Sequence, residues 1–181
     1  MQINVSQLLQ EPVGSTREYE INEAAEIIGD GKEYTVQGKC HLLRTQRSVL
    51  VKCALSVEVE LTCSRCLNWF RQPLRIKFEE EYIPTVDIHS GSPLPSPEEA
   101  SVFTIDEQHT IDLTEAVRQY SLMAMPMKAL CNEDCAGLCQ KCGQNLNQGK
   151  CDCPAEDIDP RWSELIKLLY TPVNIILEER S

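Results

Sequence analysis

The sequence contains no hydrophobic run long enough to cross a membrane. A membrane-spanning helix needs about 18–20 consecutive apolar residues, and no stretch of the chain approaches that length. The first ten residues also lack the basic patch followed by an apolar stretch that marks a secretory signal. We therefore expect a cytoplasmic protein without a membrane partner.

Histidines are scarce, and the motifs of common enzymes are absent. The chain has three histidines, His41, His89 and His109, and none lies at a recognisable spacing from a cysteine or serine nucleophile. There is no H-E-x-x-H motif, no glycine-rich phosphate loop and no G-x-S-x-G nucleophile turn. Nothing indicates a small-molecule substrate, so we expect a protein that is not an enzyme.

Positive charge is in short supply over the chain as a whole. The sequence has 17 Lys and Arg residues against 28 Asp and Glu residues, which gives a net charge of −11. Nucleic-acid phosphates would repel such a chain, so it is not a general nucleic-acid coat. Residues 39–77 differ, because they contain eight basic residues and only two acidic ones. We predict one local basic surface on an acidic body.

Three stretches of the chain show the alternation of a half-buried sheet. The 181 residues suffice for one domain, or for one domain with a small appendage. Apolar and polar residues alternate with a period of two, which is typical of antiparallel strands, over residues 34–42, 51–61 and 74–79. Short links at 44–48 and 63–68 favour a meander.

The phase of this alternation assigns each strand residue to one face of the sheet. Cys40 and Cys53 point inward, and we expect them to be small core residues. Tyr34 and Trp69 are interpreted as packing residues rather than as platforms for base stacking. The basic residues of this region point outward or lie in the links, and the candidates for RNA contacts are Lys39, Lys52, Arg65, Arg71, Arg75 and Lys77. The alternative for these charges is an ordinary solvated sheet face.

The remaining segments predict a loop, a short strand and two helices. Residues 84–101 are rich in proline and serine and predict a flexible loop, and residues 102–105 predict a short strand. Asp112 and Glu115 form a capping box for a helix that Pro126 ends. A last helix is predicted to begin at Asp159-Pro160 and to end before Pro172.

Together these patterns predict an α+β fold. It consists of an antiparallel β-meander or partial barrel, two helices and a C-terminal cysteine-rich zinc module. The chain is predicted to divide into four parts. Residues 1–83 form a β-rich part with the Cys63-x2-Cys66 hairpin, and residues 84–101 form a flexible loop. Residues 102–128 form a strand with a helix, and residues 129–181 form the zinc module with the C-terminal helix.

Cysteine spacing gives the strongest chemical signal. The chain has ten cysteines, and without a secretory signal these favour metal binding over disulfides. Eight of them form the motifs Cys63-x2-Cys66 and Cys131-x3-Cys135-x3-Cys139-x2-Cys142-x8-Cys151-x-Cys153. Residues 131–153 have few apolar side chains, so burial alone cannot fold them. A structural zinc ion contributes roughly 10–16 kcal/mol in small peptides, which would offset this deficit.

Eight cysteines can be divided into two sets of four. The preferred division places Cys139, Cys142, Cys151 and Cys153 on one zinc ion and Cys63, Cys66, Cys131 and Cys135 on a second. The second ion would fasten the C-terminal module to the hairpin. Neighbours at i and i+2 on a strand point to opposite faces, so one of Cys151 and Cys153 could be spare. A single zinc ion held by Cys63, Cys66, Cys139 and Cys142 stays open as an alternative.

The chemistry expected of such a site is structural. A zinc ion with four thiolate ligands has no open coordination position, and catalysis by zinc requires one. A redox role for Cys63-x2-Cys66 is disfavoured, because the thioredoxin-like motif opens a helix in a βαβ unit. Here the flanking segments are predicted to be strands.

Two stretches together resemble a known family. The first is Leu61-Thr-Cys63-Ser-Arg65-Cys66-Leu67, after a long alternating strand. The second is Gly137-Leu138-Cys139-x2-Cys142-Gly143-x-Asn145-Leu146-Asn147-x3-Cys151-x-Cys153, followed by Asp159-Pro160-Arg161. The linking piece from Ile111-Asp112-Leu113 to Met125-Pro126-Met127 is similar as well. Over most of its length the chain resembles the YceD family of large ribosomal RNA subunit accumulation proteins.

The resemblance implies a role in ribosome biogenesis. It implies a non-enzymatic factor that acts in the synthesis, processing or stability of 23S rRNA, with large-subunit rRNA or the pre-ribosome as partner. It transfers no catalytic residue. The acidic body adds a second hypothesis, a zinc-stabilised interaction module that binds a basic ribosomal protein and screens its charge. A Cys-x2-Cys redox protein is the third and least favoured alternative.

Overall fold

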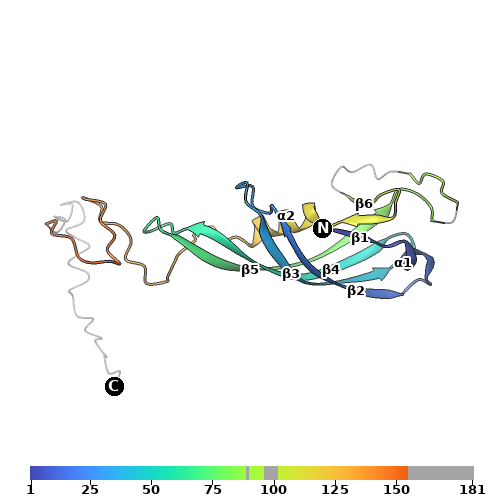
Figure 1. The fold of residues 1–181 in the computed structure, drawn as a ribbon, viewed down its shortest axis with the longest axis horizontal. Coiled ribbons are helices and arrows are strands. Elements are labelled where there is room, and N and C mark those ends of the chain that lie inside the picture. The colour runs from blue at the N-terminus through green and yellow to red at the C-terminus, as the bar shows by residue number, and fades with distance from the viewer. Residues whose placement is uncertain (89, 96–101, 155–181) are drawn as a thin grey trace, which may run out of the picture. The chain divides into compact units, whose positions relative to one another are not determined.

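Figure 1 shows the computed structural model of the chain, which describes residues 1–88, 90–95 and 102–154. The chain divides into two compact units, Met1–Gly137 and Leu138–Ser181. All the helices and strands named below lie in the first unit. In the described part of the second unit, turns and a single bridge between Leu138 and Asn145 replace regular elements.

The first unit is built on one seven-stranded sheet that curls into a half-barrel (Figure 1). Its spatial order is β1-β7-β6-β5-β4-β3-β2. The strands are β1 (Gln2–Asn4), β2 (Thr16–Ala25), β3 (Tyr34–Arg44), β4 (Val49–Thr62), β5 (Trp69–Pro84), β6 (Phe103–Ile105) and β7 (Thr110–Asp112). All neighbours are antiparallel except β5 and β6, which run parallel. The predicted meander is therefore mostly right, but the sheet is mixed.

The long strands follow the predicted alternation and extend beyond it. β5 begins at Trp69, although the sequence pattern was assigned only from residue 74. Among the described strands, the first half of β5 pairs only with β4, so it forms an edge of the sheet. Pro73 lies on this edge, where its missing N–H breaks no ladder. The short strand predicted at 102–105 is confirmed as β6.

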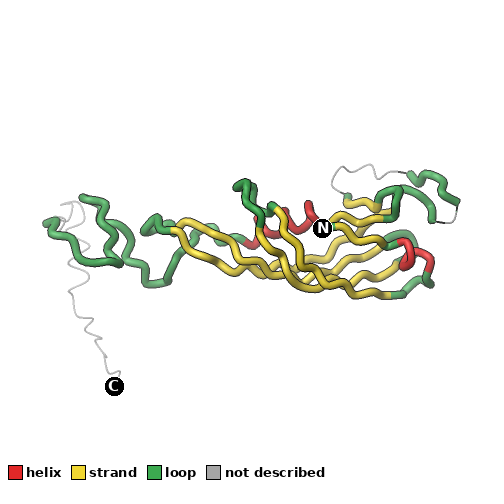
Figure 2. Tube along the Cα trace, viewed as in Figure 1, coloured by secondary structure: helices red, strands yellow, loops and turns green. Residues whose placement is uncertain are grey.

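The core lies against the inward face of the sheet, where apolar side chains of alternate strand residues meet helix α2 (Thr114–Ala124). In Figure 2 this helix is the red segment beside the N label. It buries Ala116, Val117 and Ser121. The Tyr120 ring stacks on Phe78 at 5.0 Å between centroids, and the Tyr120 hydroxyl donates to Glu80 at 2.6 Å.

The helices differ from the prediction at their ends and in number. α2 has Leu113 rather than Asp112 as its N-cap residue, although Asp112 still accepts the Thr114 N–H at 2.8 Å. The Glu115 carboxylate binds Arg118 instead of returning to the cap, so the predicted capping box is wrong. The sequence pattern missed helix α1 (Ser6–Gln10), a single short turn that buries Leu8 and Leu9.

Two further observations concern the helices. The helix predicted from Asp159 lies outside the described residues. Within the part of the chain that the structure describes, no helix is long and apolar enough to cross a membrane.

Cys40 and Cys53 are buried, as predicted, but they are not separate thiols. They stand opposite each other on β3 and β4 with their Cα atoms 4.1 Å apart, and they form a disulfide. Two residues away, Gly38 packs against β4 so closely that a Cβ atom would lie 2.3 Å from the Ala54 carbonyl oxygen. This stretch of β3 therefore requires glycine at position 38.

Candidate metal centres

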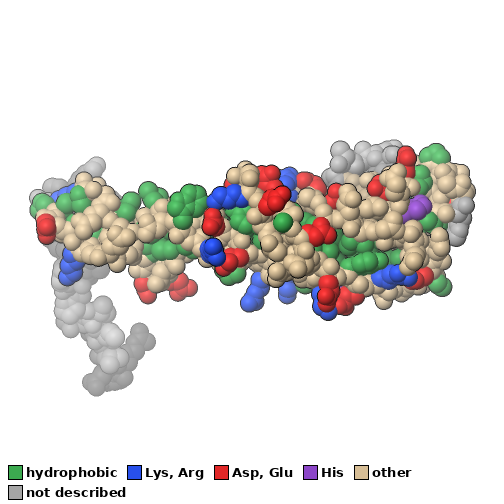
Figure 3. Space-filling view, viewed as in Figure 1, with side chains coloured by type: hydrophobic (Ala, Val, Ile, Leu, Met, Phe, Trp, Pro, Cys, Tyr) green, Lys and Arg blue, Asp and Glu red, His purple; other side chains and the backbone are tan. Residues whose placement is uncertain are grey.

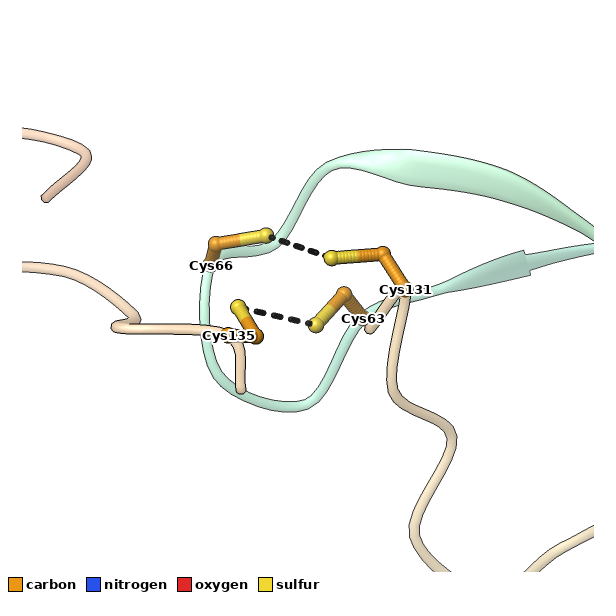
Figure 4. Close-up of side chains that lie close together, drawn as sticks. All are labelled: Cys63, Cys66, Cys131 and Cys135. Carbon is orange, nitrogen blue, oxygen red and sulfur yellow. Dashed lines mark hydrogen bonds between the residues drawn. The ribbon is translucent and has the colours of Figure 1, made fainter. Parts of the chain in front are cut away.

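The first cluster of cysteines joins two segments of the first unit. Cys63 and Cys66 lie in the turn between β4 and β5, and Cys131 and Cys135 lie in the segment after α2. Figure 4 shows the four side chains converging, and their sulfur atoms all lie within 4.8 Å of one another. The pair Cys63–Cys135 is 3.8 Å apart between sulfurs, and the pair Cys66–Cys131 is 3.6 Å apart. Tetrahedral zinc with Zn–S bonds of about 2.3 Å separates its sulfurs by about 3.8 Å, so the arrangement fits.

The turn that carries Cys63 and Cys66 is held by two backbone hydrogen bonds. The Leu67 N–H donates to the Cys63 carbonyl at 3.0 Å, and the Cys63 N–H donates to the Asn68 carbonyl at 2.9 Å. Leu67 adopts a left-handed conformation with φ of 58°. This conformation turns the chain after Cys66 so that the Asn68 carbonyl reaches the Cys63 N–H.

The second cluster uses a turn of the same design. The Gly143 N–H donates to the Cys139 carbonyl at 2.9 Å, and the Cys139 N–H donates to the Gln144 carbonyl at 2.8 Å. Gly143 has a φ of 73° and stands where the first turn has Leu67. The two Cys-x2-Cys turns are therefore structurally equivalent.

The second cluster lies within the second unit. The sulfur atoms of Cys139, Cys142, Cys151 and Cys153 lie within 4.8 Å of one another. Cys151 and Cys153 are not in a strand, so the alternation of strand faces does not separate them, and both sulfurs lie within the cluster. The Lys141 ammonium donates to the Pro154 carbonyl at 2.7 Å and closes the loop around this cluster.

The structure thus groups the eight cysteines into the two sets of four that their spacing favours. Each set lies within one unit, whereas the single-ion alternative would take two residues from each. The boundary between the units falls after Gly137, so Cys131 and Cys135 belong with the sheet and not with the second cluster.

Backbone contacts fasten the segment after α2 to the first turn. The Ser64 N–H donates to the Ala129 carbonyl at 2.8 Å. The Arg65 guanidinium donates to the carbonyl oxygens of Cys135 at 2.9 Å and Glu133 at 3.0 Å. Gly137 has a φ of +77°, and a Cβ atom there would lie 3.2 Å from the Arg65 carbonyl. The Arg65 side chain, which the sequence predicts to contact RNA, therefore binds the backbone of the segment after α2 and holds it next to the first turn.

Each cluster combines one acidic thiol with a strongly basic one. The backbone N–H of Cys131 lowers the pKa of Cys63 to about 6, and the backbone N–H of Cys142 lowers the pKa of Cys139 to about 6. Desolvation raises the pKa of Cys131 to about 12. The pKa of Cys153 is also raised to about 12, mainly by a hydrogen bond with the Cys142 side chain and to a smaller extent by desolvation. One thiolate in each cluster is thus ready at neutral pH to bind a soft divalent metal ion.

The predicted basic residues divide into neutralised and unpaired members. The Lys39 ammonium lies 2.6 Å from Glu18, and the Lys52 ammonium lies 2.9 Å from Glu79. Arg71 is 3.8 Å from Glu58. Arg75 and Lys77 are exposed, and among the described residues no carboxylate lies within 4.0 Å of either. Figure 3 shows basic and acidic side chains close together on the visible face.

Trp69 does not pack into the core, and its interpretation as a packing residue is wrong. It is 71% exposed, whereas Tyr34 is buried as expected. The alternation of β5 is the signal that indicates the exposure of Trp69. Leu74, Ile76 and Phe78 point inward, so the residues at odd-numbered positions of this strand up to Lys77 point outward. Continuing that phase to position 69 places Trp69 on the outer face.

One cavity of the first unit is lined by none of the eight clustered cysteines. It has a volume of about 660 Å³ and lies between the β3–β4 turn, which supplies Arg44, Arg47 and Ser48, and the residues after β5, which supply Val86 and Ile88. Its described lining includes no cysteine or histidine, so this cavity offers no comparable set of metal ligands.

Comparisons with known proteins identify relatives. Residues 51–169 match the model of a family described as large ribosomal RNA subunit accumulation protein YceD. A chloroplastic large ribosomal RNA subunit accumulation protein YCED homolog 1 of Arabidopsis thaliana is 37% identical over 59 residues, which are 33% of this chain and 18% of the plant protein.

Mycobacterial relatives cover more of the chain. An uncharacterized protein of Mycobacterium tuberculosis is 28% identical over 132 residues, which are 73% of this chain and 61% of the relative. An uncharacterized protein of Mycobacterium leprae is 27% identical over 127 residues, 69% of this chain and 55% of the relative. The chain thus spans less than two thirds of the length of each of these relatives. No solved structure matches it.

Proposed function

The chain belongs to the YceD family, and from this premise we propose that it is a ribosome-biogenesis factor that promotes the accumulation of 23S rRNA of the large subunit. The observation that carries the proposal is the extent of the family match. Residues 51–169 include most of β4, all of β5 and α2, and all eight cysteines of the two clusters. The name of the plant relative also refers to the accumulation of large ribosomal RNA.

Two structural zinc ions belong to this proposal. The ligands are sulfur atoms only, and their separations of 3.6 and 3.8 Å in the first cluster suit a tetrahedral ion. Zinc at Cys63, Cys66, Cys131 and Cys135 would fix the segment after α2 to the β4–β5 turn. Zinc at Cys139, Cys142, Cys151 and Cys153 would fold a unit whose described part contains no helix or ladder of strands.

The proposed factor is not an enzyme. Four thiolates fill the coordination sphere of zinc and leave no position for water or substrate. We assign the protein a positioning role in the cytoplasm, with large-subunit rRNA or the pre-ribosome as its partner. No residue is given a catalytic role.

The proposal is tested in cells depleted of the protein. The measurement is the ratio of large- to small-subunit rRNA, with the ends of the precursors mapped. We expect a selective fall of the large-subunit RNA that the intact gene restores. An unchanged ratio with normal precursor ends would contradict the proposal.

A protein partner is the second candidate, and the net charge of −11 favours it. An acidic protein could hold a basic ribosomal protein before its incorporation and screen its charge. Purification after nuclease treatment separates the two candidates. A ribosomal protein that stays bound would support this role, and loss of every partner would favour direct contact with RNA.

A further inference from the structure

One strand presents an aromatic ring and three cations in a row. Trp69, Arg71, Arg75 and Lys77 occupy alternate positions of β5, interrupted only by Pro73, and all four are exposed. Residues at alternate positions of a strand share one face of the sheet. We call these four residues the β5 strip. The part of the strip before Pro73 lies on the hairpin arm that ends in the first cysteine cluster.

The indole ring at the end of the β5 strip has one cation over it but is largely exposed. The Lys32 ammonium lies 5.2 Å from the ring centroid, within the range of a cation–π contact. Lys32 is itself fixed by Glu60, whose carboxylate lies 2.8 Å from the ammonium. Because 71% of the Trp69 surface is still exposed, the ring is available for stacking.

The other end of the β5 strip carries positive charge that the sheet does not neutralise. The neighbours of Arg75 and Lys77 on β4 are Ser56 and Ala54, which carry no charge. Lys39 and Lys52, on the same face, each have a carboxylate within 3 Å. Arg75 and Lys77 are therefore the cations of this face that can meet phosphate groups without breaking an ion pair within the described sheet.

A shallow cavity of about 360 Å³ lies beside the aromatic end of the β5 strip. It is lined by Lys32, Glu33, Tyr34, Thr35, Glu58, Glu60 and Arg71. Carboxylates of this kind repel phosphate, but they accept hydrogen bonds from the amino groups of bases. The surface thus offers a stacking ring and carboxylate acceptors at one end and free cations at the other.

We propose that the β5 strip binds single-stranded RNA, with Trp69 stacked on an unpaired base. Arg75 and Lys77 would bind phosphates several nucleotides further along the same RNA, because six residues of a strand span about 20 Å. This inference rests on the proposed function, which supplies RNA as the partner. Stacking on an aromatic side chain combined with backbone contacts by cations is the general mode of single-strand recognition. The unneutralised cations favour RNA over a protein partner, because their charge complements phosphate.

The test uses the full chain with both clusters loaded with zinc and a fluorescein-labelled RNA of about ten nucleotides. In fluorescence anisotropy, Trp69→Ala should weaken binding by roughly 5- to 100-fold, and Trp69→Phe should retain most of the affinity. Arg75→Gln/Lys77→Gln should weaken binding. It should also make the negative slope of the logarithm of the association constant against the logarithm of the salt concentration less steep by about 1.4. The control is Lys39→Gln/Lys52→Gln, which changes the net charge equally and should leave binding near that of the original protein.

Two results would overturn the proposal, and the first of them can take a form that points to a protein partner. Trp69→Ala could bind as tightly as the original protein, or the two double variants could lose equal affinity, which would indicate general electrostatics. Trp69→Ala could instead leave RNA binding intact and lose a nuclease-resistant protein partner. Failure of the proposed function would be seen in a different measurement. Depletion of the protein from cells would then leave the rRNA ratio unchanged, whether or not the β5 strip binds RNA in solution.

Discussion

The sulfur atoms of Cys63 and Cys135 lie 3.8 Å apart although 72 residues separate them in the chain. Cys66 and Cys131 repeat this relationship at 3.6 Å. These contacts connect the tip of the β4–β5 hairpin with the segment after α2, and α2 in turn packs on β5. A metal ion at this point would therefore close a loop of the chain that contains β5, β6, β7 and α2.

The two clusters are expected to bind metal independently. Cys63→Ser should reduce the zinc content from two ions to one per chain, and Cys139→Ser should do the same, because each residue belongs to only one of the two clusters. Native mass spectrometry measures the stoichiometry. Cys40→Ala/Cys53→Ala is the control and should keep both ions, because these residues lie in the disulfide. Loss of both ions in Cys63→Ser would show that the clusters are coupled.

As long as the turn of the second cluster keeps its N–H contacts, its thiols should titrate far apart in the metal-free chain. Hydrogen bonds from the backbone N–H groups of Cys142 and Lys141 lower the pKa of Cys139 to about 6, whereas the pKa of Cys153 is raised to about 12. Because the folded pKa of Cys139 is lowered, its stabilising effect is complete above its ordinary pKa and is lost as the pH falls toward 6. Alkylation of Cys139 should be half-maximal near pH 6, while Cys153 stays slow.

Mass spectrometry of alkylated peptides across a pH series measures both midpoints. Zinc should suppress both reactions, which serves as the control. A midpoint for Cys139 near the ordinary thiol value of about 8.5 would show that the turn does not form its N–H contacts without metal.

The disulfide between Cys40 and Cys53 should be detectable by counting thiols. Under denaturing conditions without metal, eight cysteines should react before reduction and ten after it. The bond closes a separation of 13 residues, so Cys40→Ala/Cys53→Ala should lower the free energy of unfolding by about 2–4 kcal/mol. A phosphine reductant should destabilise the original protein and leave the double variant unaffected. Ten reactive thiols before reduction would contradict the disulfide.

The sequence predicted the parts of this molecule that repeat with a simple period. Alternation located β3 and β4, and it turned Cys40 and Cys53 inward. It could not show that these two cysteines stand opposite each other, because register depends on the length and conformation of the β3–β4 turn. The short strands β1 and β7 were missed for a similar reason, since three residues carry too little pattern.

The grouping of the cysteines was predictable, and the exposed surface was less so. Spacing identified two Cys-x2-Cys turns, and chemistry required sets of four. The ion pairs of Lys39 and Lys52 depend on which carboxylate faces them across the sheet, which charge counting along the chain does not show. Trp69 was predictable in principle, and was missed because its strand was begun five residues too late.

Close packing at Gly38 gives a sharp test of the β3–β4 pairing. A Cβ atom at this position would lie 2.3 Å from the Ala54 carbonyl oxygen and 2.8 Å from the Leu55 Cα, and neither backbone atom can move aside easily. Gly38→Ala should lower the free energy of unfolding by about 2–3 kcal/mol in chemical denaturation. Gly31→Ala is the control, because Gly31 has positive φ but open space around it, and should cost only about 1 kcal/mol. Equal losses in the two variants would contradict the close approach.

Leu67 and Gly143 occupy the same position in the two equivalent Cys-x2-Cys turns. We therefore expect Leu67→Gly and Gly143→Leu to change stability in opposite directions. Leu67 and Gly143 both have positive φ, and this conformation costs a leucine about 1–2 kcal/mol relative to glycine. Because Leu67 is 60% exposed, Leu67→Gly loses little packing and should stabilise the first unit by up to about 1 kcal/mol.

Gly143→Leu should destabilise the second unit by a similar amount. Thermal unfolding of the zinc-loaded chain, with the metal content checked for each variant, measures both effects. A marked loss of stability in Leu67→Gly would show that the leucine side chain packs on the turn, and the two turns would then owe their common shape to different forces.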